Sequence, residues 1–215
     1  MVTTTPDDDV LAALLAEPAL AVAPRLLGSV FWSGGVGIRL TEVEAYHGQG
    51  QDPGSHAHRG RSARNDSMFE RGGTLYVYLS YGIHRCVNIV CGPEGFASGV
   101  LLRSGEVVAG VDEVRARRTT SRTSADLARG PGRLGSALGM ELGDDGSRLV
   151  ADTPGQEARF RLRLPSAPVG PIAAGPRVGV SGHAGGDAFP WRFSLEGDPS
   201  VSPYRAAVSR RRGGA

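Results

Sequence analysis

The sequence contains no lysine: all 24 side chains counted as lysine or arginine are arginines. Enzymes that attack a carbon through a Schiff base need a free amine. The guanidinium of arginine cannot take this role because it stays protonated. A side-chain amine is therefore excluded as a nucleophile. Unless the amine at the start of the chain is used, chemistry that passes through a Schiff base is excluded as well.

Cysteine is scarce, and long apolar runs are missing. The two cysteines, Cys86 and Cys91, are too far apart for the C-x-x-C motif, so we expect two reduced thiols and no metal site. No segment approaches the roughly 20 apolar residues that span a bilayer, so no membrane partner is expected. The first residues, MVTTTPDDD, carry acids where a secretory signal carries bases, which predicts a cytoplasmic protein.

The net charge of +2 does not by itself indicate a nucleic-acid partner. The arginines are nevertheless unevenly spread: Arg59, Arg61 and Arg64 lie close together, and residues 103–133 hold seven arginines against four acids. Such clusters are either solvated faces or contacts to phosphate groups, which supply the salt-dependent part of DNA affinity. Composition leaves both interpretations open.

Two strand-like blocks, residues 38–46 and 74–90, frame the part of the sequence richest in reactive and aromatic side chains. The second block is a run of β-branched and aromatic residues interrupted by Ser80, Tyr81 and Gly82. This pattern predicts a hairpin with a tight turn. Tyr81 is expected at its tip.

Alternation within these blocks brings particular side chains together, because residues two apart in a strand share one face. Glu42, Glu44 and Tyr46 share a side of the first block, and Tyr76 and Tyr78 share a side of the second. The glutamates either form the solvent-exposed face of an antiparallel sheet, or one of them is an acid or base beside an aromatic pocket for a planar, electron-poor ligand. Spacing alone does not decide between these alternatives.

The remaining segments alternate short helices and strands around a long loop. We expect helices over residues 9–15, 108–118 and 131–138, strands over residues 26–32 and 97–103, and several short strands over residues 148–193 that close the sheet. The Gly-rich loop over residues 47–60 is long enough to be functional or disordered.

Together these elements predict an α+β fold: a single mixed domain built on a curved antiparallel β-sheet, with a protruding β-hairpin and flanking helices. We place this domain at residues 24–204. An N-terminal extension with a short helix, residues 1–23, precedes it. A loose basic tail, residues 205–215, follows it.

Several separate motifs resemble one known family. They are TEVEAY at residues 41–46, SHAHRGRSARNDSMF at 55–69, GTLYVYLSYGIHRCVN at 73–88, GVLLR at 99–103, ARGPGRLGSALGM at 128–140, GPRVGVSGHAG at 175–185 and PWRFSLEGDPSVS at 190–202. In this order they resemble the alkyladenine (3-methyladenine) DNA glycosylase family of monofunctional base-excision enzymes. The resemblance extends over residues 24–202, nearly the whole chain.

The resemblance implies roles for individual residues. Glu44 matches the general base that takes a proton from the attacking water, and Arg103 matches the arginine that holds this water and the carboxylate. Glu42 is a competing candidate, to which we assign a structural or electrostatic role. The flipped base is expected among Tyr46, His56, Tyr78 and Asn88, with Tyr81 as the intercalating wedge, Ile83 beside it, and the loop arginines Arg61 and Arg64 on the DNA.

The implied activity is that of a monofunctional glycosylase. It flips alkylated or deaminated purines, of the 3-methyladenine, 7-methylguanine, hypoxanthine and ethenoadenine type, out of duplex DNA and hydrolyses the N-glycosidic bond. The implied partner is damaged duplex DNA, bound by a monomer without cofactor or metal. The absence of lysine agrees with this activity, because glycosylases that also cut the DNA backbone usually attack the sugar with an amine.

Two alternatives remain beside this hypothesis. A non-catalytic damage-recognition or architectural module could kink DNA through Tyr81, but it would gain nothing from a carboxylate such as Glu44. A hydrolase of free nucleosides is disfavoured by the wedge and by the arginine clusters. The loop over residues 47–60 is also richer in glycine than is usual for the family, so the width of the pocket and the substrate range are expected to differ.

Overall fold

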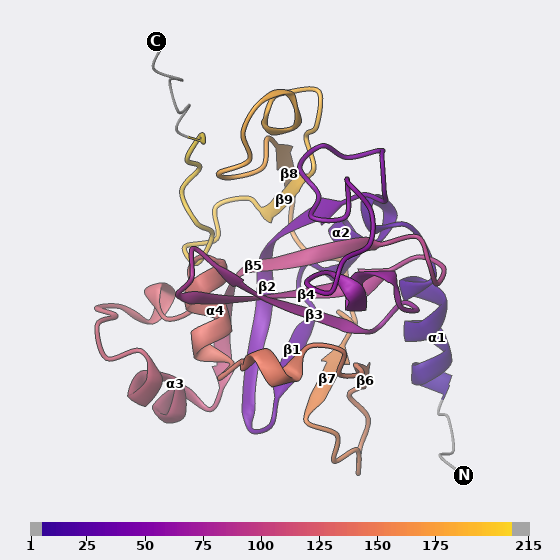
Figure 1. The fold of residues 1–215 in the computed structure, drawn as a ribbon. Coiled ribbons are helices and arrows are strands. Elements are labelled where there is room, and N and C mark those ends of the chain that lie inside the picture. Colours follow the sequence, from indigo (N-terminus) through magenta and orange to yellow (C-terminus); the bar gives the residue numbers. More distant parts are fainter. Residues whose placement is uncertain (1–5, 208–215) are drawn as a thin grey trace.

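The computed structural model describes residues 6–207 and has the α+β fold class that the sequence predicts. One curled sheet forms the centre of the molecule, and helices pack against it (Figure 1). The first five residues, and the part of the predicted basic tail beyond residue 207, lie outside the described residues. Within the described range, no helix has the length and apolar character needed to cross a membrane.

The sheet is antiparallel except at one edge. Its order is β3-β4-β5-β2-β1-β7-β6, with β9 paired to β2 and β8 paired to β9. Among the described strands, only β6 and β7 run parallel. The strands are β1 Val30–Ser33, β2 Val36–Tyr46, β3 Leu75–Ser80, β4 His84–Cys91, β5 Ser98–Ala109, β6 Val150–Ala151, β7 Phe160–Arg163, β8 Ile172–Gly175 and β9 Arg192–Leu195. The long strands β2 and β5 form its centre.

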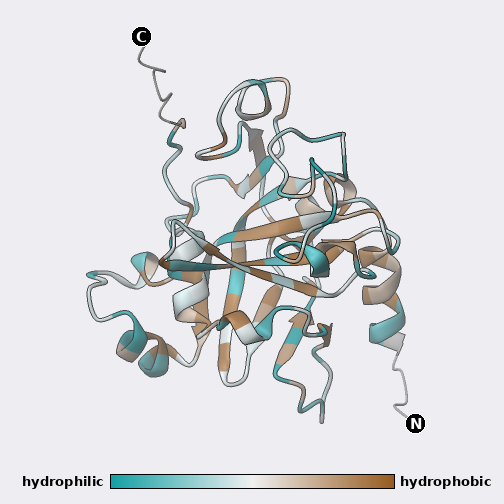
Figure 2. Ribbon diagram, viewed as in Figure 1, coloured by the Kyte–Doolittle hydropathy of each residue, from teal (hydrophilic) through white to brown (hydrophobic). Residues whose placement is uncertain are grey.

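Short helices complete the described chain. The α-helices are α1 Pro6–Leu15, α2 Ala19–Leu26, α3 Val111–Arg117 and α4 Pro131–Ala137, and the 3-10 helices are η1 Asp66–Phe69, η2 Ser124–Asp126, η3 Leu142–Asp144 and η4 His183–Gly185. Helix α2 packs against β2 and β5, and α4 packs against β4 and β5. Apolar residues of the α-helices and of the sheet form the main core, where Figure 2 shows brown segments gathered, and a smaller cluster lies around Met68 and Phe69 of η1.

One extra residue in β2 explains how this strand is apolar on one face and acidic on the other. Between Leu40 and Glu42 the strand advances two residues while its partner β5 advances one, so Thr41 forms a β-bulge. The bulge lets apolar residues on both sides of it reach the same core, namely Ile38, Leu40, Val43 and Ala45. Glu42, Glu44 and Tyr46 consequently point to the opposite face of the sheet.

The structure confirms the strand before the loop, the hairpin and the helix over residues 131–138, which correspond to β2, the β3–β4 pair and α4. The strand predicted over residues 97–103 is also present, as β5, but it continues to Ala109. The short strands expected over residues 148–193 are present as well, as β6, β7, β8 and the start of β9.

Two predicted boundaries are wrong. Leu26 does not begin a strand but ends α2, because the buried stripe of that helix outweighs the presence of Pro24 inside it. The helix predicted from residue 108 begins only at Val111, because Val108 still belongs to β5, which pairs with β2 as far as Ala109. In both cases tertiary packing overrides the local pattern.

Helix α4 approaches β4 so closely that glycine is required at the contact. A Cβ atom on Gly135 would lie 2.0 Å from the carbonyl oxygen of Arg85, and a Cβ atom on Gly132 would lie 2.7 Å from the ring of His84. His84 and Arg85 begin the returning strand of the hairpin. The close contact therefore holds the hairpin against the body of the protein beside α4 (Figure 1).

We predict that Gly135→Ala destabilises the protein by about 1–3 kcal/mol, the usual effect of overpacking, although alanine is the better helix former. Gly143→Ala is the matched control, because a Cβ atom there meets nothing within 4 Å. The free energy of unfolding in urea measures both effects. Equal stability of the two variants would contradict the close approach of α4 to β4.

Candidate active site

The face of the sheet towards which Glu44 and Tyr46 point is hollowed into a cavity of about 550 Å³, a volume typical of small-molecule sites. Strand pairing places a row of side chains across its floor. Glu44 on β2 pairs with Leu101 on β5, and Leu101 pairs in turn with Asn88 on β4. Asn88 pairs with Tyr76 on β3. Segments that follow β2 and β8 supply further walls, including Gly54.

Aromatic rings form one wall of the cavity. The rings of Tyr76 and Tyr78 stack with centroids 5.3 Å apart, and the ring of His56 meets Tyr78 edge-on at 4.6 Å. Nδ1 of His56 lies 2.9 Å from the hydroxyl of Tyr76. Desolvation, and then the positive charge of Arg64, lowers the pKa of His56, so its ring is mainly neutral at pH 7.

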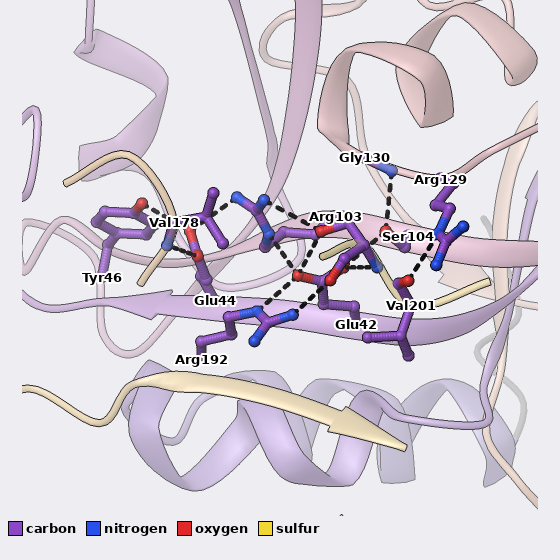
Figure 3. Close-up of polar contacts among 11 residues, drawn as sticks. Glu42, Glu44, Tyr46, Arg103, Ser104, Arg129, Gly130, Val178, Arg192 and Val201 are labelled. Carbon is purple, nitrogen blue, oxygen red and sulfur yellow. Dashed lines mark hydrogen bonds and ion pairs between the residues drawn. The ribbon is translucent and has the colours of Figure 1, made fainter. Parts of the chain in front are cut away.

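Glu44 is fully buried and accepts three hydrogen bonds (Figure 3). Its Oε2 accepts one from the hydroxyl of Tyr46 at 2.9 Å and one from Nη1 of Arg103 at 3.2 Å. Its Oε1 accepts one from the amide of Val178 at 2.6 Å. A carboxylate has about four lone-pair sites, so one remains for a further donor. All three donor residues line the cavity, which places the carboxylate directly behind its surface.

Arg103 joins Glu44 to a second buried carboxylate. Its Nε donates to Oε1 of Glu42 at 2.8 Å. Glu42 pairs with Ser104 and the next residue of β2 pairs with Leu102, so Arg103 is itself a bulge residue, whose side chain reaches both carboxylates. Burial acts to lower the pKa of Arg103, but the two carboxylates outweigh burial and raise it, so the guanidinium stays charged.

Glu42 is saturated with donors. They are Nε of Arg103 at 2.8 Å, Nε of Arg192 at 2.7 Å, the hydroxyl of Ser104 at 2.7 Å, and the amide and hydroxyl of Ser202 at 2.8 and 2.9 Å. Burial acts to raise the pKa of Glu42, but the charge of Arg103, the hydrogen bond from Ser104 and the charge of Arg192 together lower it to about 2. Glu42 therefore has no lone pair left for water, whereas Glu44 has one.

The tyrosines around the cavity keep their protons. Desolvation, and then the charge of Glu44, raises the pKa of Tyr46 well above its usual value. Its hydroxyl is therefore a hydrogen-bond donor to Glu44. Desolvation also raises the pKa of Tyr78, and raises that of Tyr76 to about 12. The aromatic wall is thus uncharged at neutral pH.

Tyr81 and Ile83 form the tip of the β3–β4 hairpin and are 89% and 68% exposed. The φ angles of Tyr81 and Gly82 are +51° and +73°, and the amide of Ile83 donates to the carbonyl of Ser80 at 3.1 Å. Positive φ at both central residues is the mark of a type I′ turn. A tyrosine in this region is strained by about 1–3 kcal/mol, and its exposed ring gains no packing there. Such an outlier points to function.

The two loop arginines differ in their surroundings. Arg61 is paired with Asp66 at 2.5 Å and lies over the ring of Phe69 at 5.5 Å. Arg64 lines the cavity together with Tyr81, and no residue of the described chain forms an ion pair with it. The charge of Arg64 is therefore the one available to an anion at the mouth of the cavity.

The structure brings most of the sequence-predicted site together. Tyr46, His56, Tyr78, Asn88 and Arg103 line one cavity, with Glu44 behind its surface and Tyr81 at its rim. Ile83 lies at the same tip but lines a separate cleft, and Arg61 lies outside the main cavity. The alternative of a solvent-exposed glutamate face is wrong, because Glu42 and Glu44 are both fully buried.

Sequence reasoning missed three parts of the site. The amide of Val178 could not be foreseen, because a backbone donor leaves no mark in the residue type. Tyr76 could have been included, since it alternates with Tyr78. Asn88, which was predicted, lines the cavity, and its Nδ2 donates to the carbonyl of Tyr76 at 3.1 Å. The buried pair of Asp52 and Arg177 was also not predicted.

Comparisons with known proteins agree on one family. The profile of the family described as "Methylpurine-DNA glycosylase (MPG)" matches residues 13–199. A protein of Nocardia farcinica is 54% identical over 196 residues, which is 89% of each chain. A protein of Leifsonia xyli subsp. xyli is 52% identical over 202 residues, 90% of this chain and 91% of the relative.

A protein of Streptomyces avermitilis is similar to the same extent. It is 49% identical over 203 residues, which is 92% of each chain. All three relatives carry the name "Putative 3-methyladenine DNA glycosylase". The matched region contains the whole cavity, from Tyr46 to the segment after β8.

We predict that Glu42 makes the folded protein sensitive to acid. Its pKa is about 2 in the folded state, against an ordinary value of 4.5. Between these values the unfolded state binds more protons, so stabilisation that is present above pH 4.5 is lost as the pH falls towards 2. The expected loss is about 3 kcal/mol.

Urea unfolding across this pH range measures the effect. In Glu42→Gln this part of the pH dependence should be absent, while Glu157→Gln, at an exposed residue, should retain it. An unchanged pH dependence in Glu42→Gln would contradict the assignment.

Proposed function

This chain belongs to the methylpurine-DNA glycosylase family, and on that premise we propose how its cavity acts on DNA. A protein of this family is a DNA glycosylase, and its partner is DNA. We propose that a damaged purine is flipped out of the duplex into the cavity, where a water activated by Glu44 hydrolyses its N-glycosidic bond. The observation that carries the proposal is the open lone-pair site of Glu44, a buried carboxylate directly behind an aromatic cavity.

The hairpin tip suits the task of flipping. A base cannot react while it is stacked in the helix, so the enzyme must extrude the nucleotide and fill the gap. Tyr81 and Ile83 are exposed, apolar and held on a strained turn, and wedges of this kind unstack a base step at a cost of about a few kcal/mol. Because Tyr81 also lines the rim of the cavity, the extruded nucleotide would lie at its mouth, where Arg64 can pair with a phosphate.

The cavity offers flat, uncharged rings to the flipped base. Attraction between a cationic purine and an aromatic ring contributes about 0.5–2 kcal/mol, which favours 3-methyladenine and 7-methylguanine only modestly. We propose that a labile glycosidic bond supplies the remaining selectivity for cationic purines, and that weak pairing extends the substrate range to hypoxanthine and ethenoadenine. Asn88, whose amide is fixed by the carbonyl of Tyr76, would disfavour the exocyclic amine of normal guanine.

The chemical step needs one proton acceptor and one stabilising charge. The water oxygen forms a bond to C1′ of the sugar, the bond from C1′ to the purine nitrogen breaks, and its electron pair leaves with the base. A cationic purine leaves as a neutral molecule, whereas a neutral purine leaves as an anion that takes a proton from solvent. The open site of Glu44 takes the water proton, and its negative charge stabilises the oxocarbenium-like transition state. Arg103 orients the carboxylate and, as a cavity-lining donor, can also hold the water.

A binding module without chemistry is the second candidate. It would need the wedge and the arginines but not Glu44, and a buried carboxylate near DNA phosphates would only weaken its affinity. We therefore favour the enzyme. A duplex that carries ethenoadenine or hypoxanthine separates the two: release of the base supports the enzyme, and a retarded but intact duplex supports the module.

We predict that Glu44→Gln abolishes excision but not binding. Loss of a general base and of its charge should lower the single-turnover rate by about 10³-fold or more, while the Kd for the damaged duplex changes little. The rate is measured with enzyme in excess, followed by hot alkali to cut the abasic sites. Glu157→Gln is the matched control at an exposed glutamate. An excision rate of wild-type size in Glu44→Gln would end the assignment.

We also predict that the protein leaves the DNA backbone intact. Because the chain has no lysine, no side-chain amine can form a Schiff base with the sugar. Strand breaks should therefore appear only after alkali, and borohydride should trap no covalent complex between protein and DNA. A trapped complex would show that the terminal amine acts as the nucleophile and would contradict water as the attacking group.

A further inference from the structure

Arg177 has no exposed surface, although it carries a charge and lies next to the candidate active site. Its guanidinium makes a two-pronged contact with Asp52, with distances of 2.6 and 2.7 Å to the two carboxylate oxygens. It also donates to the carbonyl oxygens of Ala45 and Ala184, at 3.0 and 3.1 Å. A planar guanidinium that makes this many hydrogen bonds is held in a single orientation.

The same guanidinium is packed between aromatic rings. Its central carbon lies 4.5 Å from the centroid of Tyr46 and 5.0 Å from that of Trp191. Tyr46 lines the cavity and Arg177 does not. Gly54 covers the guanidinium from the loop side, because a Cβ atom on Gly54 would lie 2.7 Å from Nη2 of Arg177. Arg177 thus supports the cavity wall from behind.

Asp52 extends this support into the loop over residues 47–60. Besides Arg177, its carboxylate accepts hydrogen bonds from the amide of Gly54 at 2.8 Å and from the amide of His47 at 3.2 Å. The loop that carries His56 is therefore anchored through Asp52. Because Asp52 is fully buried and does not line the cavity, it has no contact with a base bound there.

Arg177 is also joined to the catalytic carboxylate through its neighbours. The next residue, Val178, donates its amide to Glu44 at 2.6 Å, and the ring that Arg177 supports, Tyr46, donates its hydroxyl to Glu44 at 2.9 Å. Two of the three hydrogen bonds on Glu44 therefore come from groups that Arg177 holds in place. The third comes from Arg103.

We propose that Arg177 is a positioning residue for excision: through Asp52, Tyr46 and Val178 it fixes both the base-binding wall and the direction of the free lone pair of Glu44. This inference rests on the proposed function, since it needs Glu44 to be the base. Arg177 has no exposed surface, so its side chain itself contacts neither DNA nor the attacking water. Small displacements of reacting groups, of the order of 1 Å, can slow a reaction by about 10²-fold, so loss of this support should appear in the rate of the chemical step.

Arg177→Lys is the first test, because it keeps the positive charge but removes the planar guanidinium and its two-atom contact with Asp52. The single-turnover excision rate on a duplex carrying ethenoadenine should fall by about 10²-fold. The Kd for the same duplex should stay within about threefold, because Tyr81 and Arg64, the groups proposed to grip the duplex, lie outside the segments that Arg177 contacts. Rates are expressed per folded enzyme, determined by titration with the duplex. A merely structural role would lower the folded fraction and leave this rate unchanged.

Arg161→Lys is the matched control. Arg161 is also paired with an aspartate, Asp152 at 2.9 Å, and also lies over an aromatic ring, that of Trp32 at 5.5 Å, but it belongs to β7, away from the cavity. It should excise at the wild-type rate. Asp52→Asn is a second variant, for use if Arg177→Lys does not fold. Asparagine has nearly the same shape as aspartate, so the packing is kept while the charge is removed. We expect this variant also to slow excision.

The outcomes separate this inference from the proposed function. Slow excision by Arg177→Lys or Asp52→Asn, together with normal excision by Arg161→Lys, supports the positioning role. Wild-type rates per folded enzyme in both variants of the Asp52–Arg177 pair overturn it and leave the glycosylase proposal standing. If the wild-type protein releases no base from any damaged duplex, the proposed function itself is overturned, and the inference with it.

Discussion

The guanidinium of Arg103, buried between Glu42 and Glu44, is the interaction on which the site depends. The carboxyl groups of Glu42 and Glu44 both contact this guanidinium in a poorly solvated interior, where its positive charge offsets the repulsion between them. Removing one partner of such a buried group leaves an uncompensated charge, at a cost of about 3–5 kcal/mol. All lone pairs of Glu42 accept hydrogen bonds from the protein, and one of these bonds fixes Arg103. Glu44 can therefore keep one lone pair free for water.

The fold is arranged to make this contact possible. Bulges at Thr41 and Arg103 let two central strands be apolar towards the helices and acidic or basic towards the cavity. The C-terminal segment then returns to this face, where Ser202 donates to Glu42. Figure 3 shows its neighbour Val201, whose carbonyl accepts a hydrogen bond from Arg129 at 2.8 Å. Residues far apart in the chain are thus needed to complete one small site.

Much of this architecture could be predicted from the sequence, and the limits have physical causes. The hairpin with Tyr81 at its tip is a local feature, because alternation and a tight turn specify it. The burial of Glu44 could not be derived from spacing, since an alternating glutamate has the same pattern on a wet face as on a buried one. Arg177 was not foreseen because its partner, Asp52, is 125 positions away in the chain, and no periodicity connects the two.

The most direct test of this account is a crystal structure of Glu44→Gln bound to a duplex that carries ethenoadenine. The account predicts the flipped base in the cavity against Tyr46, His56 and Tyr78, with Tyr81 in the gap and a water between residue 44 and C1′ of the sugar. A base that remains stacked in the helix, or a C1′ atom out of reach of residue 44, would contradict it.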